Sequence, residues 1–206
     1  MNSHLRRILL FVALTALSVL SGCWTYSLQP IYSDDDPNLT YEPALEGTWK
    51  TESNESITIT GDFESKKYQL ECVGVSSNPE EPAKPDFDIT FSGRLVELGA
   101  GRFLDVVPER SETEGGPGML PAHNVFKVSL QGDTLVLSPL NVDWLCKASQ
   151  ADQAALGQCI DGDFILTAST DVLQGYVRDH SDDEHVFPES DDGDGFRRVA
   201  KPGSAE

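Results

Sequence analysis

The sequence predicts a mainly β fold with two helices late in the chain (α+β), in which an antiparallel meander closes as a small barrel. One observation is the alternation of apolar and polar residues, clearest where Phe87, Ile89 and Phe91 alternate with polar neighbours. Another is the glycine-containing turns between such segments, at 98–102 and 132–133. After Pro139 the apolar spacing becomes helical. Short strands joined by tight turns favour an antiparallel meander, which forms a barrel if its edges pair.

Residues 1–22 have the pattern of an export signal. Arg6 and Arg7 precede an apolar run over 8–20. The run is long enough for the apolar part of a signal and too short to cross a bilayer comfortably. An ordinary secretory signal followed by an incidental cysteine, Cys23, stays an alternative, as does an uncleaved helix.

The four residues Leu20-Ser21-Gly22-Cys23 resemble the lipobox of bacterial lipoproteins. The resemblance implies that the Cys23 thiol is diacylglycerated, that the chain is cut just before it, and that the new amine is acylated. Several acyl chains hold a protein stably on a membrane, whereas one does so only marginally. Since Trp24 rather than Asp follows the cysteine, the resemblance implies the outer membrane, facing the periplasm. In a host with one membrane it implies the outer leaflet of the cytoplasmic membrane.

The mature chain divides into three expected parts. Residues 23–42 read as a tether, because they hold two prolines and an acidic run with little periodicity. A single barrel domain is expected over 43–199, and a disordered tail over 200–206. No second apolar stretch approaches the length of a membrane span.

The predicted domain begins with Gly47-Thr48-Trp49, which resembles the Gly-x-Trp of the first strand in lipocalin-like barrels. The resemblance implies that Trp49 closes one end of the barrel. It also implies that a basic residue from the last strand region packs on the indole, here Arg197 or Arg198. The domain would then be a small lipocalin-like barrel.

The remaining elements follow from local pattern. The expected strands cover 56–60, 68–72, 87–98, 103–107, 126–130, 135–137, 164–167 and 196–199. One helix is expected over 143–156, ended by Gly157. A second is expected after Ser169 or Thr170 and ends near Asp183. Both helices should pack on the barrel, and the loops at 76–85 and 108–121 lie either at its mouth or as surface insertions.

Three cysteines remain if Cys23 is acylated. An oxidising compartment permits one disulfide, and Cys146–Cys159 is expected because these two are closest in sequence. Cys72 lies on the apolar side of its strand pattern and reads as a small buried residue. No Cys/His spacing fits a metal site, and an EF-hand near the acidic run 191–194 is excluded by Ser190 and Lys201.

Charge and motifs exclude several classes of function. Removing Arg6 and Arg7 with the signal takes the net charge from −19 to −21, so a nucleic-acid partner is excluded. No nucleophile motif is present, and no catalytic residue or cofactor is predicted. His123 is expected to be a hydrogen-bonded residue at a strand end, while His180 and His185 are expected to be solvated.

Two function classes therefore stay open. The first is a membrane-anchored envelope protein whose barrel binds an apolar or amphiphilic small molecule. The second is a structural or protein-interaction component of the envelope with a side-chain-filled barrel. The order of motifs also resembles a group of uncharacterised bacterial lipoproteins, which implies no particular activity. The motifs are the lipobox, 30–32, 47–49, 103–105, 120–123, 143–145, 166–170 and 173–174.

Overall fold

The structure is a computed structural model that describes residues 25–53, 55–74, 88–109, 122–148, 153, 155–188 and 195–200. The predicted signal with Cys23, the loop at 76–85, most of the loop at 108–121 and the tail after 200 lie outside the described residues.

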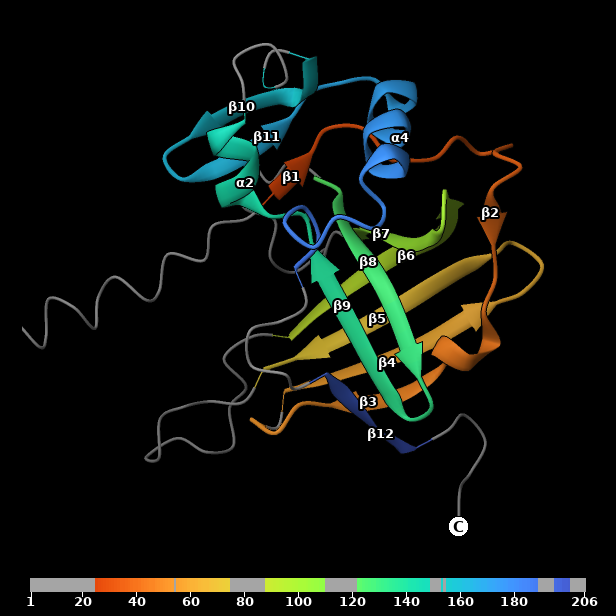
Figure 1. Ribbon diagram of the computed structural model, residues 1–206. Coiled ribbons are helices and arrows are strands. Elements are labelled where there is room, and N and C mark those ends of the chain that lie inside the picture. Colours follow the sequence, from red (N-terminus) through yellow and green to blue (C-terminus); the bar gives the residue numbers. More distant parts are fainter. Residues whose placement is uncertain are drawn as a thin grey trace, which may run out of the picture.

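The described chain forms a closed antiparallel barrel of eight strands, as predicted (Figure 1). Around the barrel the order is β6-β5-β4-β3-β12-β9-β8-β7, and β7 pairs back with β6 to close it. The strands are β3 (Gly47–Lys50), β4 (Ser56–Asp62), β5 (Lys67–Val73), β6 (Asp88–Leu98), β7 (Gly101–Pro108), β8 (Asn124–Gln131), β9 (Thr134–Pro139) and β12 (Phe196–Ala200).

Two of the hairpins depend on glycine. Leu98 pairs with Gly101 and Gln131 pairs with Thr134, so each turn has two residues. The first turn residue is Gly99 in one hairpin and Gly132 in the other, with φ of 62° and 61°. This left-handed conformation suits two-residue turns and costs glycine little.

One core fills the barrel from its inner face. It contains Leu45, Trp49, Ile57, Ile59, Tyr68, Leu70, Leu95, Leu104, Val106, Val128 and Leu135. Inward positions recur at every second residue, as at Leu104 and Val106, because successive side chains in a strand point to opposite faces.

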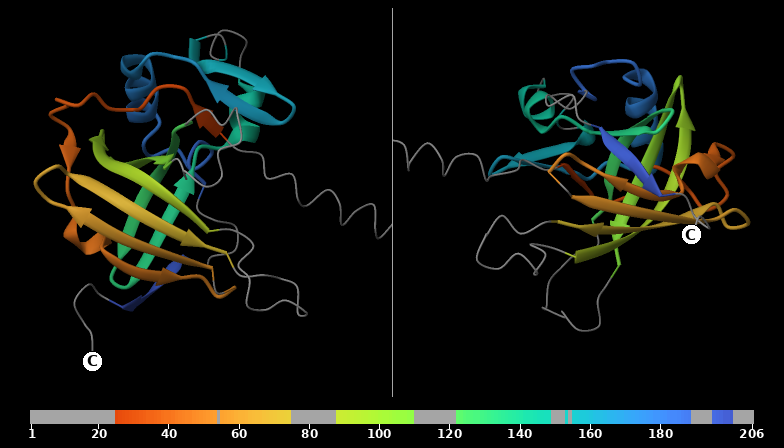
Figure 2. Two further views of the ribbon diagram at one scale, coloured as in Figure 1. Left: turned by 180° about the vertical axis from the view of Figure 1, so that it is seen from behind. Right: turned by 90° about the horizontal axis from the view of Figure 1, so that it is seen from below.

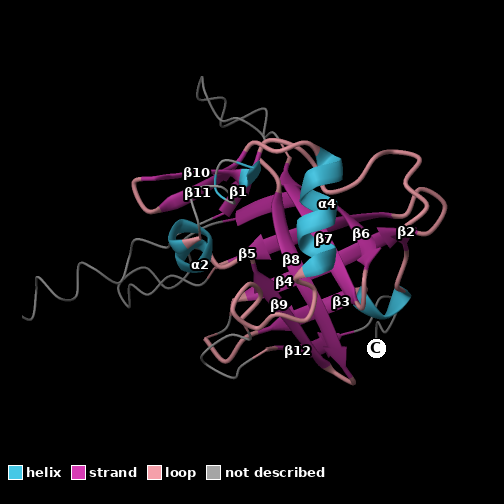
Figure 3. Ribbon diagram, turned by 45° about the horizontal axis from the view of Figure 1, so that its top comes forward, coloured by secondary structure: helices cyan, strands magenta, loops and turns pink. Residues whose placement is uncertain are grey.

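A second layer, which we call the cap, lies over one side of the barrel (Figures 1 and 2). It consists of β1 (Thr25–Ser27), α2 (Val142–Lys147), β10 (Gly157–Ile160), β11 (Asp163–Leu166) and α4 (Thr170–Asp179). In Figure 3, α4 lies in front of β7.

A second core joins the cap to the barrel. The outward side chains of Val96, Leu98 and Phe103 pack with apolar residues of the cap, including Phe164 and Leu173. The strands β6 and β7 therefore bury apolar residues on both faces, which is unusual for an antiparallel sheet with one side in water.

The structure corrects the predicted tether at 23–42. Thr25–Ser27 pairs in parallel with β11, and β2 (Leu39–Thr40) pairs with β6. Ile31 is 1% exposed and belongs to the second core. The apolar residues of this segment are isolated, and most of their partners lie far along the chain, so no periodicity revealed them. The folded domain begins by Thr25 and not at 43.

The helix predicted over 143–156 is also wrong as a single element. It ends at Lys147, because Ala148 has φ −58° and ψ 162°. Gly157 begins β10, where a Cβ would lie 1.9 Å from the carbonyl oxygen of Ile165. The later helix, α4, ends at Asp179 rather than near Asp183 and packs Leu173 and Val177 into the second core.

Candidate functional site

One end of the barrel is closed around Trp49. The indole is completely buried, and its Nε1 donates a hydrogen bond to the carbonyl oxygen of Leu45 at 2.8 Å. Of the two arginines proposed to stack on it, Arg198 does so, with its guanidinium carbon 3.9 Å from the ring centroid. Arg197 is exposed.

Arg198 also holds the chain that leads into the barrel. Its two terminal nitrogens donate to the carbonyl oxygens of Glu46 at 2.7 Å and Ala44 at 2.6 Å. Its Nε donates to the carboxylate of Asp133 in the β8–β9 turn at 3.2 Å. The guanidinium of β12 thus contacts β3, the segment that precedes β3, and the β8–β9 turn.

An aromatic group continues this closed end. The rings of Tyr41 and Tyr68 are stacked with centroids 5.0 Å apart. Burial, more than any other cause, raises the pKa of Tyr68 to about 12. The Tyr68 hydroxyl accepts a hydrogen bond from the backbone N–H of Glu42, whose carboxylate accepts one from Arg102. These contacts fill the closed end with ordered side chains.

The opposite end is more open, and it is the candidate site. It lies where β5 ends and where β6 and β8 begin, which places Cys72, Phe91 and Phe126 on the inner face. These side chains and Leu137 of β9 are only partly buried, and Ile89 is 41% exposed. The inner surface here is apolar, partly exposed and built from four strands.

One polar atom lies on this surface. The Oδ1 atom of Asn124 is buried, and among the described residues it has no hydrogen-bond partner. Asn124 pairs with Val106, which faces the barrel core, so both side chains point inward. A buried acceptor without a partner costs about 1–3 kcal/mol, so a donor on a bound molecule would stabilise it.

Cys72 supplies a natural probe of this end. Its thiol is free, and burial raises its pKa to about 11. The thiol therefore stays protonated and reacts slowly near neutral pH. It was predicted to be a buried apolar residue, and the structure places it at the edge of the core, partly accessible.

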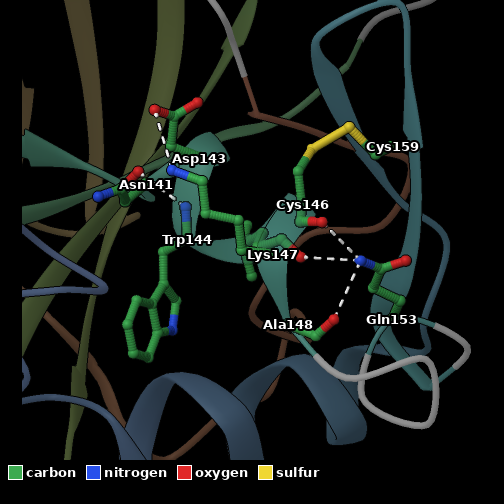
Figure 4. Close-up of a disulfide and its surroundings, with 9 residues drawn as sticks. Asn141, Asp143, Trp144, Cys146, Lys147, Ala148, Gln153 and Cys159 are labelled. Atoms are coloured by element: carbon green, nitrogen blue, oxygen red, sulfur yellow. Dashed lines mark hydrogen bonds and ion pairs between the residues drawn. A yellow bond between two sulfur atoms is a disulfide. The ribbon is translucent and has the colours of Figure 1, made fainter.

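A disulfide joins Cys146 of α2 to Cys159 of β10 (Figure 4). The side-chain nitrogen of Gln153 donates to the carbonyl oxygens of Cys146 at 2.8 Å and Ala148 at 3.2 Å. It thereby satisfies carbonyl groups at the end of the short helix. The disulfide and Gln153 thus tie α2 to the rest of the cap.

The most buried carboxylate of the described residues was not recognised from the sequence. Asp105 is 1% exposed and faces the cap, where it accepts hydrogen bonds from the Ile31 backbone N–H at 2.8 Å and His123 Nδ1 at 2.6 Å. His123 is hydrogen-bonded at a strand end, as expected, and its backbone bridges to Ser27. A lone Asp within the apolar run 103–107 was the available signal.

The other histidines make surface contacts. The ring of His185 stacks on Trp144 with centroids 5.2 Å apart, and His180 Nδ1 lies 3.6 Å from a carboxylate oxygen of Asp183. They were expected to be solvated, and both remain partly exposed. Within the described ranges, no group of three or more His, Cys, Asp or Glu side chains is placed to hold a metal ion.

Comparisons with protein-family models, curated proteins and solved structures give no match. Among the described residues, no helix has both the length and the apolar character needed to cross a membrane.

Proposed function

We propose that this protein is a bacterial lipoprotein of the cell envelope whose barrel binds an apolar or amphiphilic small molecule at its open end. The single observation that carries the binding function is the difference between the two ends of the barrel. Ordered polar and aromatic contacts close the end around Trp49, while partly exposed apolar side chains line the other. Ligand sites are mostly apolar with a few placed polar groups, and Asn124 Oδ1 is such a group here.

The ligand is best detected on the protein taken from its own cells. We expect non-denaturing mass spectrometry of the purified protein to show a bound lipid-like molecule that is released by organic solvent. Phe126→Glu should remove it, because a carboxylate would enter the apolar surface. Val199→Glu is the matched control, since Val199 is 59% exposed on β12. Binding unaffected by Phe126→Glu in a protein that still melts cooperatively would contradict the proposal.

A second readout uses the free thiol. If a molecule occupies the open end, alkylation of Cys72 should be slower in the protein as purified than after solvent extraction and refolding. The acylated Cys23 and the disulfide between Cys146 and Cys159 leave Cys72 as the only free thiol of the mature chain. Equal rates in the two preparations would indicate an empty site.

One observation favours the alternative of a structural or protein-interaction component. Much of the interior, from Trp49 to Leu135, is filled by large buried side chains. A barrel filled throughout would use its outer surface for a protein partner of the envelope. The same mass spectrometry separates the two proposals, because a filled barrel carries no bound molecule.

The anchor is proposed from the Leu20-Ser21-Gly22-Cys23 motif. Trp24 after the cysteine favours the outer membrane, with the domain in the periplasm. In cells fed labelled palmitate, Cys23→Ser should abolish labelling and leave the protein as precursor or in the soluble fraction. Undiminished labelling of the Cys23→Ser protein would contradict the anchor and leave the proposed ligand site untouched.

A further inference from the structure

The start of the described chain fixes which side of the domain meets the membrane, if Cys23 carries the anchor. In the mature chain that cleavage before Cys23 would produce, only Cys23 and Trp24 precede Thr25, which is already part of the cap. Two residues span at most about 7 Å between the Cα atoms of Cys23 and Thr25, whatever their conformation. The headgroup layer on each side of a bilayer is itself roughly 5–8 Å thick. Thr25 must therefore lie at the level of the headgroups or just above them.

The register of the small sheet shows what lies beside Thr25. β1 runs parallel to β11, and Thr25 pairs with Phe164. Phe164 comes two residues after Gly162 in the β10–β11 turn, and it also pairs with Cys159 of β10. The chain thus enters the cap at the same edge as the β10–β11 turn (Figure 1).

Thr25 has no freedom to swing away from this edge. It is 9% exposed, and its Oγ1 donates a hydrogen bond to the carbonyl oxygen of Leu140 at 3.1 Å. Two residues on, Ser27 exchanges two backbone hydrogen bonds of 2.8 Å with His123 at the barrel wall. The attachment point is therefore rigid relative to both layers.

Apolar residues are exposed on this layer. Ile160, the last residue of β10 before the turn, is 44% exposed. Trp144 of α2 is 39% exposed and lies two residues from Cys146, whose disulfide fixes α2 to β10. Of the seven large apolar side chains exposed in the described part of the chain, four lie on or next to the cap: Leu28, Trp144, Ile160 and Val172.

We infer that the edge of the cap formed by the β10–β11 turn and the start of β1 rests on the bilayer that holds the Cys23 acyl chains. The occupant of this surface is the zwitterionic headgroup layer, because Asp161 of the turn and Asp163 at the start of β11 would be repelled by an anionic surface. Tyr26, beside Asp163, suits a headgroup environment, where aromatic rings with a polar tip are enriched. The inference depends on the anchor in the proposed function and not on the ligand site.

The test places tryptophan probes at two turns of the acylated, full-length mature protein. Ile160→Trp reports on the cap edge, and Phe63→Trp in the β4–β5 turn is the matched control, 72% exposed and on the other side of the molecule (Figures 1 and 2). Both are made in a Trp24→Phe background, whose own fluorescence is subtracted. The proteins are reconstituted in phosphatidylcholine vesicles that contain a lipid with a nitroxide on its headgroup.

We expect the nitroxide to quench Ile160→Trp and to leave Phe63→Trp nearly unquenched. A spacer of about twelve Gly and Ser residues between positions 24 and 25, with a mean length of about 19 Å, should reduce the quenching of Ile160→Trp to that of the control. Equal quenching of the two probes without the spacer overturns the inference, and so does quenching that the spacer leaves unchanged. Acylation is verified by mass before reconstitution, so failure of the anchor itself would be recognised separately.

Discussion

The carboxylate of Asp105 and the imidazole of His123 lie 2.6 Å apart, almost wholly buried between the barrel and the cap. Because an ionised carboxylate can only accept, Nδ1 of His123 donates this hydrogen bond. The second oxygen of Asp105 accepts from the Ile31 backbone N–H. One side chain of β7 thus fixes both the segment that follows β1 and the segment that precedes β8.

Asp105→Ala should lower the free energy of unfolding by about 3 kcal/mol, because it leaves two buried donors without partners. Chemical denaturation monitored by circular dichroism measures this loss. Asp143→Ala is the control: its contact with Lys147 is exposed and 3.7 Å long, and its removal should cost less than about 1 kcal/mol. Equal losses in the two variants would show that the Asp105 contacts do not stabilise the fold.

Trp49→Ala should lower the free energy of unfolding by about 3–5 kcal/mol, as for other fully buried tryptophans. Trp144→Ala should have a much smaller effect, because Trp144 is partly exposed. Thermal melts of the two variants make the comparison. A Trp49→Ala protein that melts with the wild type would show that the indole does not close the barrel.

The free energy of the contact between Trp49 and Arg198 can be measured separately from the other contacts of the two residues. A double-mutant cycle with Trp49→Leu and Arg198→Met should give a coupling of about 0.5–2 kcal/mol, the range for a cation over an aromatic ring. Arg197→Met is the control, and its coupling to Trp49→Leu should be close to zero. A coupling of Arg197 equal to that of Arg198 would contradict the observed stacking.

Removal of the disulfide should loosen the cap more than the barrel. Cys146 and Cys159 are separated by 13 residues. A disulfide that closes a loop of this size raises the free energy of the unfolded chain by about 3 kcal/mol. Replacement of both by serine should lower stability by up to that amount. Hydrogen exchange should quicken in α2 and β10 and change little in β4 and β5. Uniform quickening across both layers would show that the cap and the barrel open together.

The Cys72 thiol makes the free energy of unfolding depend on pH. Its folded pKa is raised to about 11 from an ordinary value of 9.0, so the folded protein holds this proton more tightly than the unfolded chain. The contribution of this proton to the free energy of unfolding is fully present below pH 9 and is lost as the pH rises through 11. Cys72→Ala should flatten the fall in stability over this interval, and iodoacetamide should react slowly with the wild type below pH 9. Rapid alkylation at pH 8 would contradict the raised pKa.

Local patterns predicted the barrel well and the cap poorly. Alternation and turn glycines are local signals, so β4 to β9 and the turn at 132–133 followed from neighbouring residues, while the turn predicted over 98–102 is shorter, because β7 begins at Gly101. The pairing of Thr25 with Phe164 involves residues far apart in the sequence, and no local pattern reports it. For the same reason Ile31 and Leu39 looked like isolated apolar residues in a tether.

The sequence predicted contacts at the closed end and in the cap, but not the candidate site at the open end. Trp49 and an arginine near the chain end came from one motif, and Cys146 and Cys159 from their spacing. The open end could not be predicted, because inner faces are shared by many strands and only the register shows which end of each strand stays accessible. Asp105 could not be recognised either, since its two partners come from segments before and after β7.

The pairings that complete the two layers have a consequence for how the protein reaches its native state. β1 cannot pair until β11 is available, and β3 cannot complete its pairing until β12, which begins at Phe196, is available. If the chain crosses the cytoplasmic membrane N-terminus first, as its proposed signal implies, the cap is incomplete until α4 has crossed, and the barrel is incomplete until β12, close to the end of the chain, has crossed. During that interval β3 is an unpaired edge and the outer faces of β6 and β7 are bare, a state prone to aggregation. Export should therefore depend on periplasmic holding factors, and truncation before Phe196 should leave a chain that is degraded rather than anchored.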